Sequence, residues 1–127
     1  MIVGLGLDVV EIGRIARILD GPAARVERFL ARCFTPAERA FCEARRDRAT
    51  AYAARFAAKE AAVKALGAPR GVSWQHLEVT RAEGQAPVLR LAARAAAAGK
   101  RLGVARAHLT LTHDAGVAAA VVVLEAP

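Results

Sequence analysis

The stretch Arg55-Phe-Ala-Ala-Lys59-Glu60-Ala-Ala-Val-Lys64-Ala-Leu-Gly67 lies in a long run of good helix formers. We expect a helix over residues 47–66, ended by Gly67 and by the proline that follows it. Each residue of a helix advances by about 100°, so Glu60 and Lys64 lie one turn apart on the same strip of its surface. This is the longest element that the sequence predicts.

The charged residues of this helix have more than one interpretation. Glu60 and Lys64 could form an ordinary exposed ion pair, worth only ~0.3–0.5 kcal/mol, or they could belong to a functional site. Lys59 is less ordinary, because it falls inside the apolar arc, with Arg55 near the edge of that arc. A cation there needs a ligand, a subunit interface, or a stem that carries the charge out to water. The arc itself consists of Tyr52, Phe56, Val63 and Leu66.

Residues 2–10, IVGLGLDVV, are typical of a strand. Alternation places Gly4, Gly6 and Asp8 on one face and the aliphatic side chains on the other. Two glycines on one face allow another group to approach the backbone closely. Asp8 could cap the next helix, since it has capping-box spacing to Glu11. It could equally be a hard oxygen ligand for Mg²⁺, and the spacing in sequence does not bring it together with Glu60.

The remaining elements alternate between helices and locally paired strands, which predicts a single α+β domain over residues 1–127. His113 lies at the turn of the last hairpin, where a histidine is a structural hydrogen-bond partner more often than a ligand-facing residue. The expected helices are 11–19, 23–31, 36–44 and 92–99, the last ended by Gly99, and the expected strands are 75–81, 87–91, 106–112 and 117–124.

Composition limits the partners. Among 127 residues, Lys and Arg number 19 and Asp and Glu 12, giving a net charge of +7, so the protein should prefer polyanionic partners. Cys33 and Cys42 form no paired motif and are expected to be reduced thiols. No segment approaches the ~20 apolar residues of a membrane span. The apolar start is not a signal peptide, so we expect a cytoplasmic protein.

These pieces, in this order, resemble the bacterial holo-acyl-carrier-protein synthase type of 4′-phosphopantetheinyl transferase, and the resemblance covers essentially the whole chain. The RFAAKEA…KALG run is the most specific part. The other matching segments are Gly4-Leu-Gly6-Leu-Asp8, Arg14, Phe34-Thr35-Pro36-Ala37-Glu38, Phe41-Cys42, Thr112-His113 and Ala118-Ala119-Ala120-Val121.

The resemblance implies a small α+β fold in which a mostly antiparallel sheet packs against one long and several short helices. It implies transfer of phosphopantetheine from coenzyme A to a serine of an acidic acyl carrier protein, in fatty-acid biosynthesis. It also implies a homotrimer with active sites between subunits, which would give Lys59 a place to pack. Nucleic acid and membrane are not expected partners.

The residue roles follow from the same resemblance. It assigns Mg²⁺ to Asp8 and Glu60, which with Lys64 make up the catalytic group. Coenzyme binding falls to Lys64, Arg55, Gly67 and His113, and carrier docking to Arg14, with Arg17, Arg25 and Arg28 as neighbours. The proton acceptor for the serine is either Glu60 or a metal-bound water.

Three departures from the family pattern are present. Threonines stand at 110 and 112 where the family often has serines. The other two concern loops: the segment after the long helix reads Gly67-Ala-Pro-Arg-Gly71 rather than Gly-x-Gly, and a Gly-x-Pro turn appears as Gly84-Gln-Ala-Pro87. Two other functions remain open from the residues alone. One is a nucleic-acid-binding module, suggested by the charge although no stacking motif is present. The other is a different Mg²⁺ nucleotide enzyme, such as a phosphohydrolase.

Overall fold

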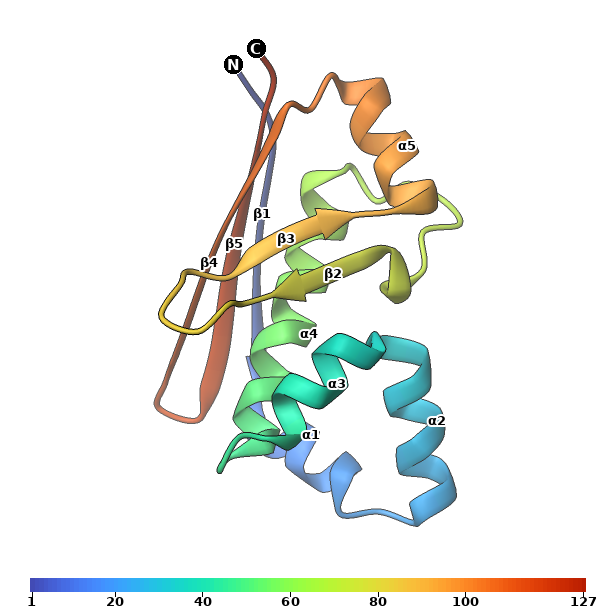
Figure 1. Ribbon diagram of the computed structural model, residues 1–127, viewed down its shortest axis with the longest axis vertical. Helices are drawn as coiled ribbons and strands as arrows, with labels where there is room; N and C mark the ends of the chain where they lie inside the picture. The colour runs from blue at the N-terminus through green and yellow to red at the C-terminus, as the bar shows by residue number, and fades with distance from the viewer.

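The computed structural model describes residues 1–127 and has an α+β architecture, as expected (Figure 1). A three-stranded antiparallel sheet has the order β1-β5-β4, and β2 and β3 form a separate antiparallel pair. The elements are β1 Ile2–Glu11, α1 Ile12–Leu19, α2 Ala23–Cys33, α3 Pro36–Glu43, α4 Arg48–Ala65, the 3-10 turn η1 Trp74–His76, β2 Leu77–Thr80, β3 Val88–Leu91, α5 Ala93–Leu102, β4 Arg106–Asp114 and β5 Val117–Glu125.

Helix α4 is the centre of the molecule and packs directly on β1 and β5. Its buried positions are mostly alanines and surround the helix, so the narrow core stripe expected from Tyr52, Phe56, Val63 and Leu66 was wrong. The small side chains let the helix approach the sheet. A Cβ on Gly4 or Gly6 would collide with the backbone of α4 at Ala65 or Ala61. The glycine face of β1 is therefore closed by α4 and is not open to a ligand beside Asp8.

Two of the expected boundaries differ clearly from the structure. Gly99 lies inside α5, where it packs against Leu91, and the helix ends at Gly103 in the left-handed conformation with φ 76°. The strand expected from residue 75 begins only at Leu77, because Ser73 caps the turn η1 by accepting a hydrogen bond from the Gln75 amide. Each difference comes from a local cap or a close tertiary contact.

Lys59 is fully buried, and none of the three solutions expected for it holds. Its Nζ forms an ion pair with Glu38 Oε1 at 2.7 Å and donates to the carbonyl oxygens of Trp74 at 2.8 Å and Leu77 at 2.7 Å. Glu38 also accepts from the Thr35 amide at 2.8 Å, which completes a capping box at the start of α3. The lysine thus joins α4, α3 and β2 within one chain and needs no subunit interface.

The outer face of the three-stranded sheet carries no helix, since the helices lie on its other side (Figure 1). Leu5, Leu7 and Val9 of β1 are 67%, 57% and 58% exposed there. The register places them opposite Val123, Val121 and Ala119 of β5. We call this set of six residues the outer apolar face.

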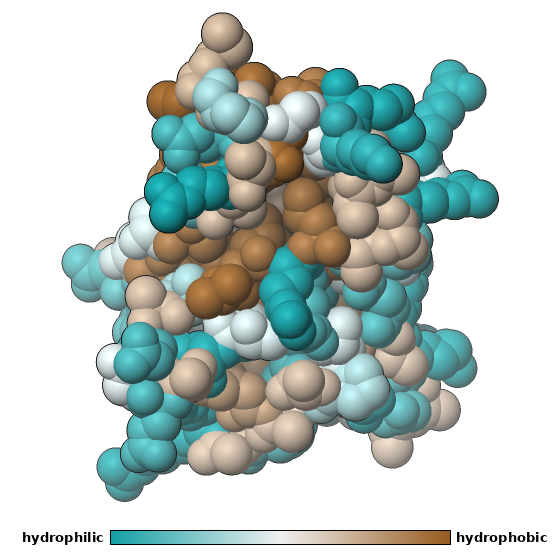
Figure 2. Space-filling model, turned by 45° about the horizontal axis from the view of Figure 1, so that its top comes forward, coloured by the Kyte–Doolittle hydropathy of each residue, from teal (hydrophilic) through white to brown (hydrophobic).

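Elsewhere the surface is mixed. On the side that Figure 2 shows, hydrophilic side chains project around the margins of a central apolar area. No helix combines the length and the apolar character that crossing a bilayer requires.

Candidate active site

Asp8 and Glu60 come together where β1 passes α4. Lys64, one turn after Glu60, donates from Nζ to Asp8 Oδ1 at 3.1 Å and to the Leu7 carbonyl at 2.9 Å. Burial raises the pKa of Glu60, and the nearby Asp8 charge raises it further, which places the two carboxylates within electrostatic reach. Two carboxylates far apart in sequence therefore lie close together.

The ordinary alternatives for these residues do not hold. The residue at the N-cap of α1 is Glu11, without a side-chain cap, and Asp8 lies within β1. Lys64 pairs with Asp8 rather than with Glu60. The neighbouring position of Asp8 and Glu60 is thus not explained by a helix cap or by a surface pair along the helix.

The residues fit a magnesium ion. No group of three or more His, Cys, Asp or Glu side chains of this chain is placed to hold a metal, so the two carboxylates are its candidate ligands. Magnesium takes one or two carboxylates and fills its octahedral shell with water and phosphate oxygens. The pKa of Glu60 is raised first by burial and then by the Asp8 charge, and a pair of neighbouring carboxylates suits a divalent cation of this kind.

The resemblance also assigned roles to Arg14 and Gly67. Arg14, on α1, is exposed, and its positive charge acts on Glu60 in the direction that lowers the pKa of that carboxyl. Gly67 follows α4 with φ 82° and has open space where a side chain would stand. The glycine satisfies the left-handed conformation that ends the helix and leaves that side of the helix end accessible.

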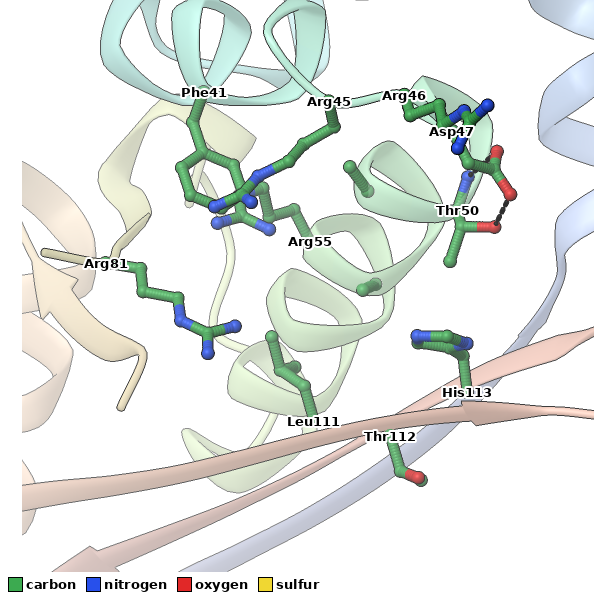
Figure 3. Close-up of a pocket in the computed structure, with 12 residues that line it drawn as sticks. Phe41, Arg45, Arg46, Asp47, Thr50, Arg55, Arg81, Leu111, Thr112 and His113 are labelled. Atoms are coloured by element: carbon green, nitrogen blue, oxygen red, sulfur yellow. Dashed lines mark hydrogen bonds between the residues drawn. The ribbon is translucent and has the colours of Figure 1, made fainter. Parts of the chain in front are cut away.

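Arg55 and His113 line a different cavity, which we call the basic pocket (Figure 3). Its volume is about 620 Å³, and α3, α4, β4 and the segment after β2 enclose it. The basic side chains that line it are Arg45, Arg46, Arg55, Arg81 and His113. Its one acid, Asp47, is already used by the amide and hydroxyl of Thr50.

Arg55 is the buried cation of the basic pocket and is 4% exposed. Its Nε and Nη2 atoms have no hydrogen-bond partner, although both are buried. Burial lowers its pKa, and the charges of Arg45 and Arg81 lower it further. A buried guanidinium without an acceptor is costly, so the pocket is built for an anion.

The carboxylate pair and the basic pocket lie on different sides of α4. Arg55 and Glu60 are separated by about 140° around the helix, and Arg55 and Lys64 by about 180°. The charges that act on Glu60 are those of Asp8, Lys64 and Arg14, whereas those that act on Arg55 belong to α3 and the basic pocket. One chain therefore presents two half-sites on opposite sides of its central helix.

A second cavity, of about 790 Å³, lies on the Glu60 side of α4 and was missed by sequence reasoning. We call it the arginine-aromatic cavity, and it is lined by Arg25, Arg28, Phe29, Ala31, Arg32, Cys33, Phe56 and Trp74. The Glu60 charge acts on the Cys33 thiol, which places the carboxylate beside this cavity. The sequence carried one indication of this cavity: Phe56 lies four residues before Glu60, so the two side chains are neighbours on the surface of the helix.

Comparison with known proteins agrees with the fold. The family model for the 4′-phosphopantetheinyl transferase superfamily matches residues 4–122. A holo-[acyl-carrier-protein] synthase of Anaeromyxobacter sp. (strain K) is 71% identical over 125 residues, covering 98% of this chain and 97% of that protein. The synthase of Myxococcus xanthus is 58% identical over 122 residues, with 96% and 94% covered.

Solved structures give the same result. The holo-[acyl-carrier-protein] synthase of Neisseria meningitidis superimposes with a TM-score of 0.85 at 29% identity, covering 98% of this chain and 99% of that one. The Helicobacter pylori enzyme, solved in complex with coenzyme A, gives 0.80 at 28% identity, covering 95% and 99%.

The chain thus belongs to the 4′-phosphopantetheinyl transferase superfamily. Within that superfamily it is an enzyme of the holo-[acyl-carrier-protein] synthase kind, the one to which its 71% and 58% identical relatives belong.

Proposed function

We propose that this chain carries out Mg²⁺-dependent transfer of 4′-phosphopantetheine from coenzyme A to a serine of an acidic acyl carrier protein, and that it does so in the cytoplasm for fatty-acid biosynthesis. The serine oxygen attacks the pyrophosphate phosphorus on the pantetheine side. The bond from that phosphorus to the bridging oxygen breaks, and adenosine 3′,5′-bisphosphate leaves with the bonding electrons. The observation that carries the proposal is the meeting of Asp8, Glu60 and Lys64.

Each of these three side chains has a part in that step. Asp8 and Glu60 would hold the magnesium ion, which would supply positive charge to the pyrophosphate oxygens. Lys64 is 55% exposed at its side chain and can turn from Asp8 to the leaving phosphate, where it offsets the charge that develops. The serine proton would pass to Glu60 or to a water held beside it.

The basic pocket is the place for the nucleotide end of coenzyme A. That end carries a phosphate monoester on the ribose, which matches a pocket with several cations and an unpartnered buried guanidinium. Arg55 would meet this phosphate from the floor of the pocket, with His113 at its rim. The phosphate of the leaving group is thereby anchored away from the reacting atoms.

A coenzyme that contacts both half-sites of a single chain would have to pass around α4. We therefore propose that the carboxylate pair of one subunit works with the basic pocket of a neighbouring copy. The outer apolar face supports this, since three exposed β1 side chains form a continuous apolar surface with β5. A homotrimer in which these faces meet would bury them and place the half-sites of different subunits opposite each other.

We assign carrier docking to the Glu60 side of the molecule. Arg14 acts on Glu60 from α1, and Arg25 and Arg28 line the adjoining arginine-aromatic cavity. Basic side chains around an apolar floor suit an acidic amphipathic helix. A carrier bound there would bring its serine to the carboxylate pair, as the reaction requires.

The test is to incubate the protein with an apo carrier, coenzyme A and Mg²⁺ and to weigh the carrier by mass spectrometry. We expect the phosphopantetheine mass on the serine, lost on chelation of the metal and restored by Mg²⁺. Glu60→Gln should reduce the rate at least 100-fold, because it removes a charged ligand of the metal. Glu83→Gln, an exposed change in the β2–β3 turn, is the matched control and should keep the rate.

Other outcomes would favour the other functions. Release of free phosphopantetheine without a carrier would indicate a hydrolase, and salt-dependent DNA binding without coenzyme A binding would indicate a nucleic-acid-binding module. Running several fatty-acid and polyketide carriers in parallel identifies the carrier class that is used. No transfer to any bacterial carrier would contradict the proposal.

A further inference from the structure

Phe41, on α3, is the one aromatic ring that lines the basic pocket. The guanidinium carbon of Arg55 lies 3.8 Å from its ring centroid, and that of Arg45 lies 4.1 Å from the same centroid (Figure 3). One half-buried ring therefore contacts two cations that come from different parts of the chain. Arg45 follows the end of α3, and Arg55 belongs to α4.

Nothing else in the structure holds these two cations together. Neither Arg45 nor Arg55 forms an ion pair, and two positive charges at such close range repel each other. A cation over an aromatic face is attracted to the ring. The ring of Phe41 therefore opposes the repulsion and keeps the exposed Arg45 from turning out to water.

We propose that Phe41 is a positioning residue that aligns Arg45 and Arg55 on one phosphate monoester, and that it thereby determines how strongly the enzyme prefers coenzyme A to the analogue that lacks the ribose phosphate. The ring does not touch the phosphate itself. It removes the entropy cost of ordering Arg45 at the moment of binding, and it holds both guanidinium groups on the same anion. This inference rests on the proposed function, because it assigns the nucleotide end of the coenzyme to the basic pocket.

The first experiment measures binding without transfer. Adenosine 3′,5′-bisphosphate and adenosine 5′-monophosphate are titrated calorimetrically into the wild-type protein and into Phe41→Leu and Phe41→Tyr. Leucine keeps an apolar side chain but has no aromatic face, whereas tyrosine keeps the face. We expect Phe41→Leu to bind the bisphosphate roughly tenfold more weakly, the loss of about one good cation contact, with the affinity for the monophosphate unchanged. Phe41→Tyr should restore the wild-type preference.

The second experiment uses turnover and a double-mutant cycle. The ratio of kcat/KM for coenzyme A to that for dephospho-coenzyme A should fall roughly tenfold in Phe41→Leu, through KM and with kcat unchanged. Arg45→Ala should lower the ratio similarly, and adding it to Phe41→Leu should lower it little further, because the ring acts through this arginine. Melting curves of all variants identify any loss of folding.

The two failures are distinguishable. No turnover of either coenzyme by the wild-type protein would remove the proposed function, whereas the calorimetric comparison would still report on Phe41. An unchanged preference in Phe41→Leu, or a preference that Phe41→Tyr fails to restore, would overturn the inference and leave the ring as ordinary packing.

Discussion

At the scale of single residues, Lys59 and Lys64 are separated by five positions of one helix and differ in what they can do. The ammonium group of Lys59 has three protons, and Glu38, Trp74 and Leu77 accept all three. It has none left for a phosphate. Lys64 is half exposed and has two acceptors, both at the edge of the carboxylate pair. Only the second lysine is free to serve the leaving group, although both belong to the same motif.

The Cys42 thiol should make the fold less stable as the pH rises through the alkaline range. The side chain is completely buried, and burial raises its pKa from 9.0 to about 12. A group with a raised folded-state pKa stabilises the fold fully below its unfolded pKa and loses that contribution as pH rises through the folded one. Between pH 9 and 12 we expect Cys42 to lower the free energy of unfolding by ~1.4 kcal/mol per pH unit. The phenol of Tyr52, whose pKa burial and Glu43 also raise, acts in the same direction above pH 10.

Urea denaturation at pH 8, 9, 10 and 11 measures this slope. In Cys42→Ala, the free energy of unfolding should fall less steeply above pH 9, by ~1.4 kcal/mol per pH unit, whatever the effect of the substitution at pH 8. Leu124→Ala, another fully buried position, is the control, because it should lower stability equally at every pH. Parallel slopes for the wild type and Cys42→Ala would show that the thiol does not titrate in this way.

At the scale of elements, the contact between β1 and α4 depends on Gly6, which has no side chain to hold them apart. A Cβ there would meet the backbone of Ala61, which cannot move without shifting the helix. We expect Gly6→Ala to destabilise the protein by at least ~3 kcal/mol, as overpacking against backbone does at its severe end. It should also separate Asp8 from Glu60 and so reduce metal binding.

A matched change on α1 isolates this effect. At Gly13, a Cβ would meet only the flexible ends of Glu11 at 3.2 Å and of Arg17 at 3.5 Å, and the position is helical. Gly13→Ala should therefore leave the melting temperature unchanged or raise it slightly, through the higher helix propensity of alanine. If Gly6→Ala and Gly13→Ala lost equal stability, Gly6 would matter for chain flexibility and not for the close approach of β1 to α4.

The sequence predicted these elements well where the signal is local. Thr35, Pro36 and Glu38 form a capping box that is visible in the sequence, and the structure has it. The predictions failed where a distant group decides the outcome. Lys59 looked misplaced because its partner Glu38 belongs to another helix. The glycines of β1 looked open because the helix that covers them, α4, lies far away in the sequence. The second cavity near Glu60 needed α2 and η1 in place before it existed.

At the scale of the whole molecule, the outer apolar face should hold subunits together. Leu7 lies in the middle of this face and is 57% exposed. Leu7→Glu would bury a charge at the interface, so we expect the trimer to dissociate. The mass measured by light scattering should then fall from that of about three chains to that of a single chain, 13.4 kDa. Val88→Glu is the control, since Val88 is 54% exposed but belongs to the β2–β3 pair. A wild-type protein that is monomeric in solution would contradict the proposed trimer.

The two half-sites lie on opposite sides of α4. This arrangement allows a stricter test of sites shared between subunits than the mass of the oligomer does. Glu60→Ala spoils the carboxylate pair and leaves the basic pocket intact, and Arg55→Ala does the reverse. If a site takes its halves from two subunits, each variant alone is inactive, but mixed trimers contain intact sites. Random reassembly of an equal mixture should restore about a quarter of the wild-type activity, because each half must come from the correct parent.

The matched control is a mixture of Glu60→Ala with Asp8→Ala. Both changes fall in the same half-site, so no arrangement of subunits rebuilds it, and this mixture should stay inactive. His113→Ala, at an exposed position on the rim of the basic pocket, repeats the test without disturbing the buried Arg55. If neither pocket variant regains activity with Glu60→Ala, both halves of a site must belong to one chain. The coenzyme would then have to pass around α4, and the trimer would serve stability alone.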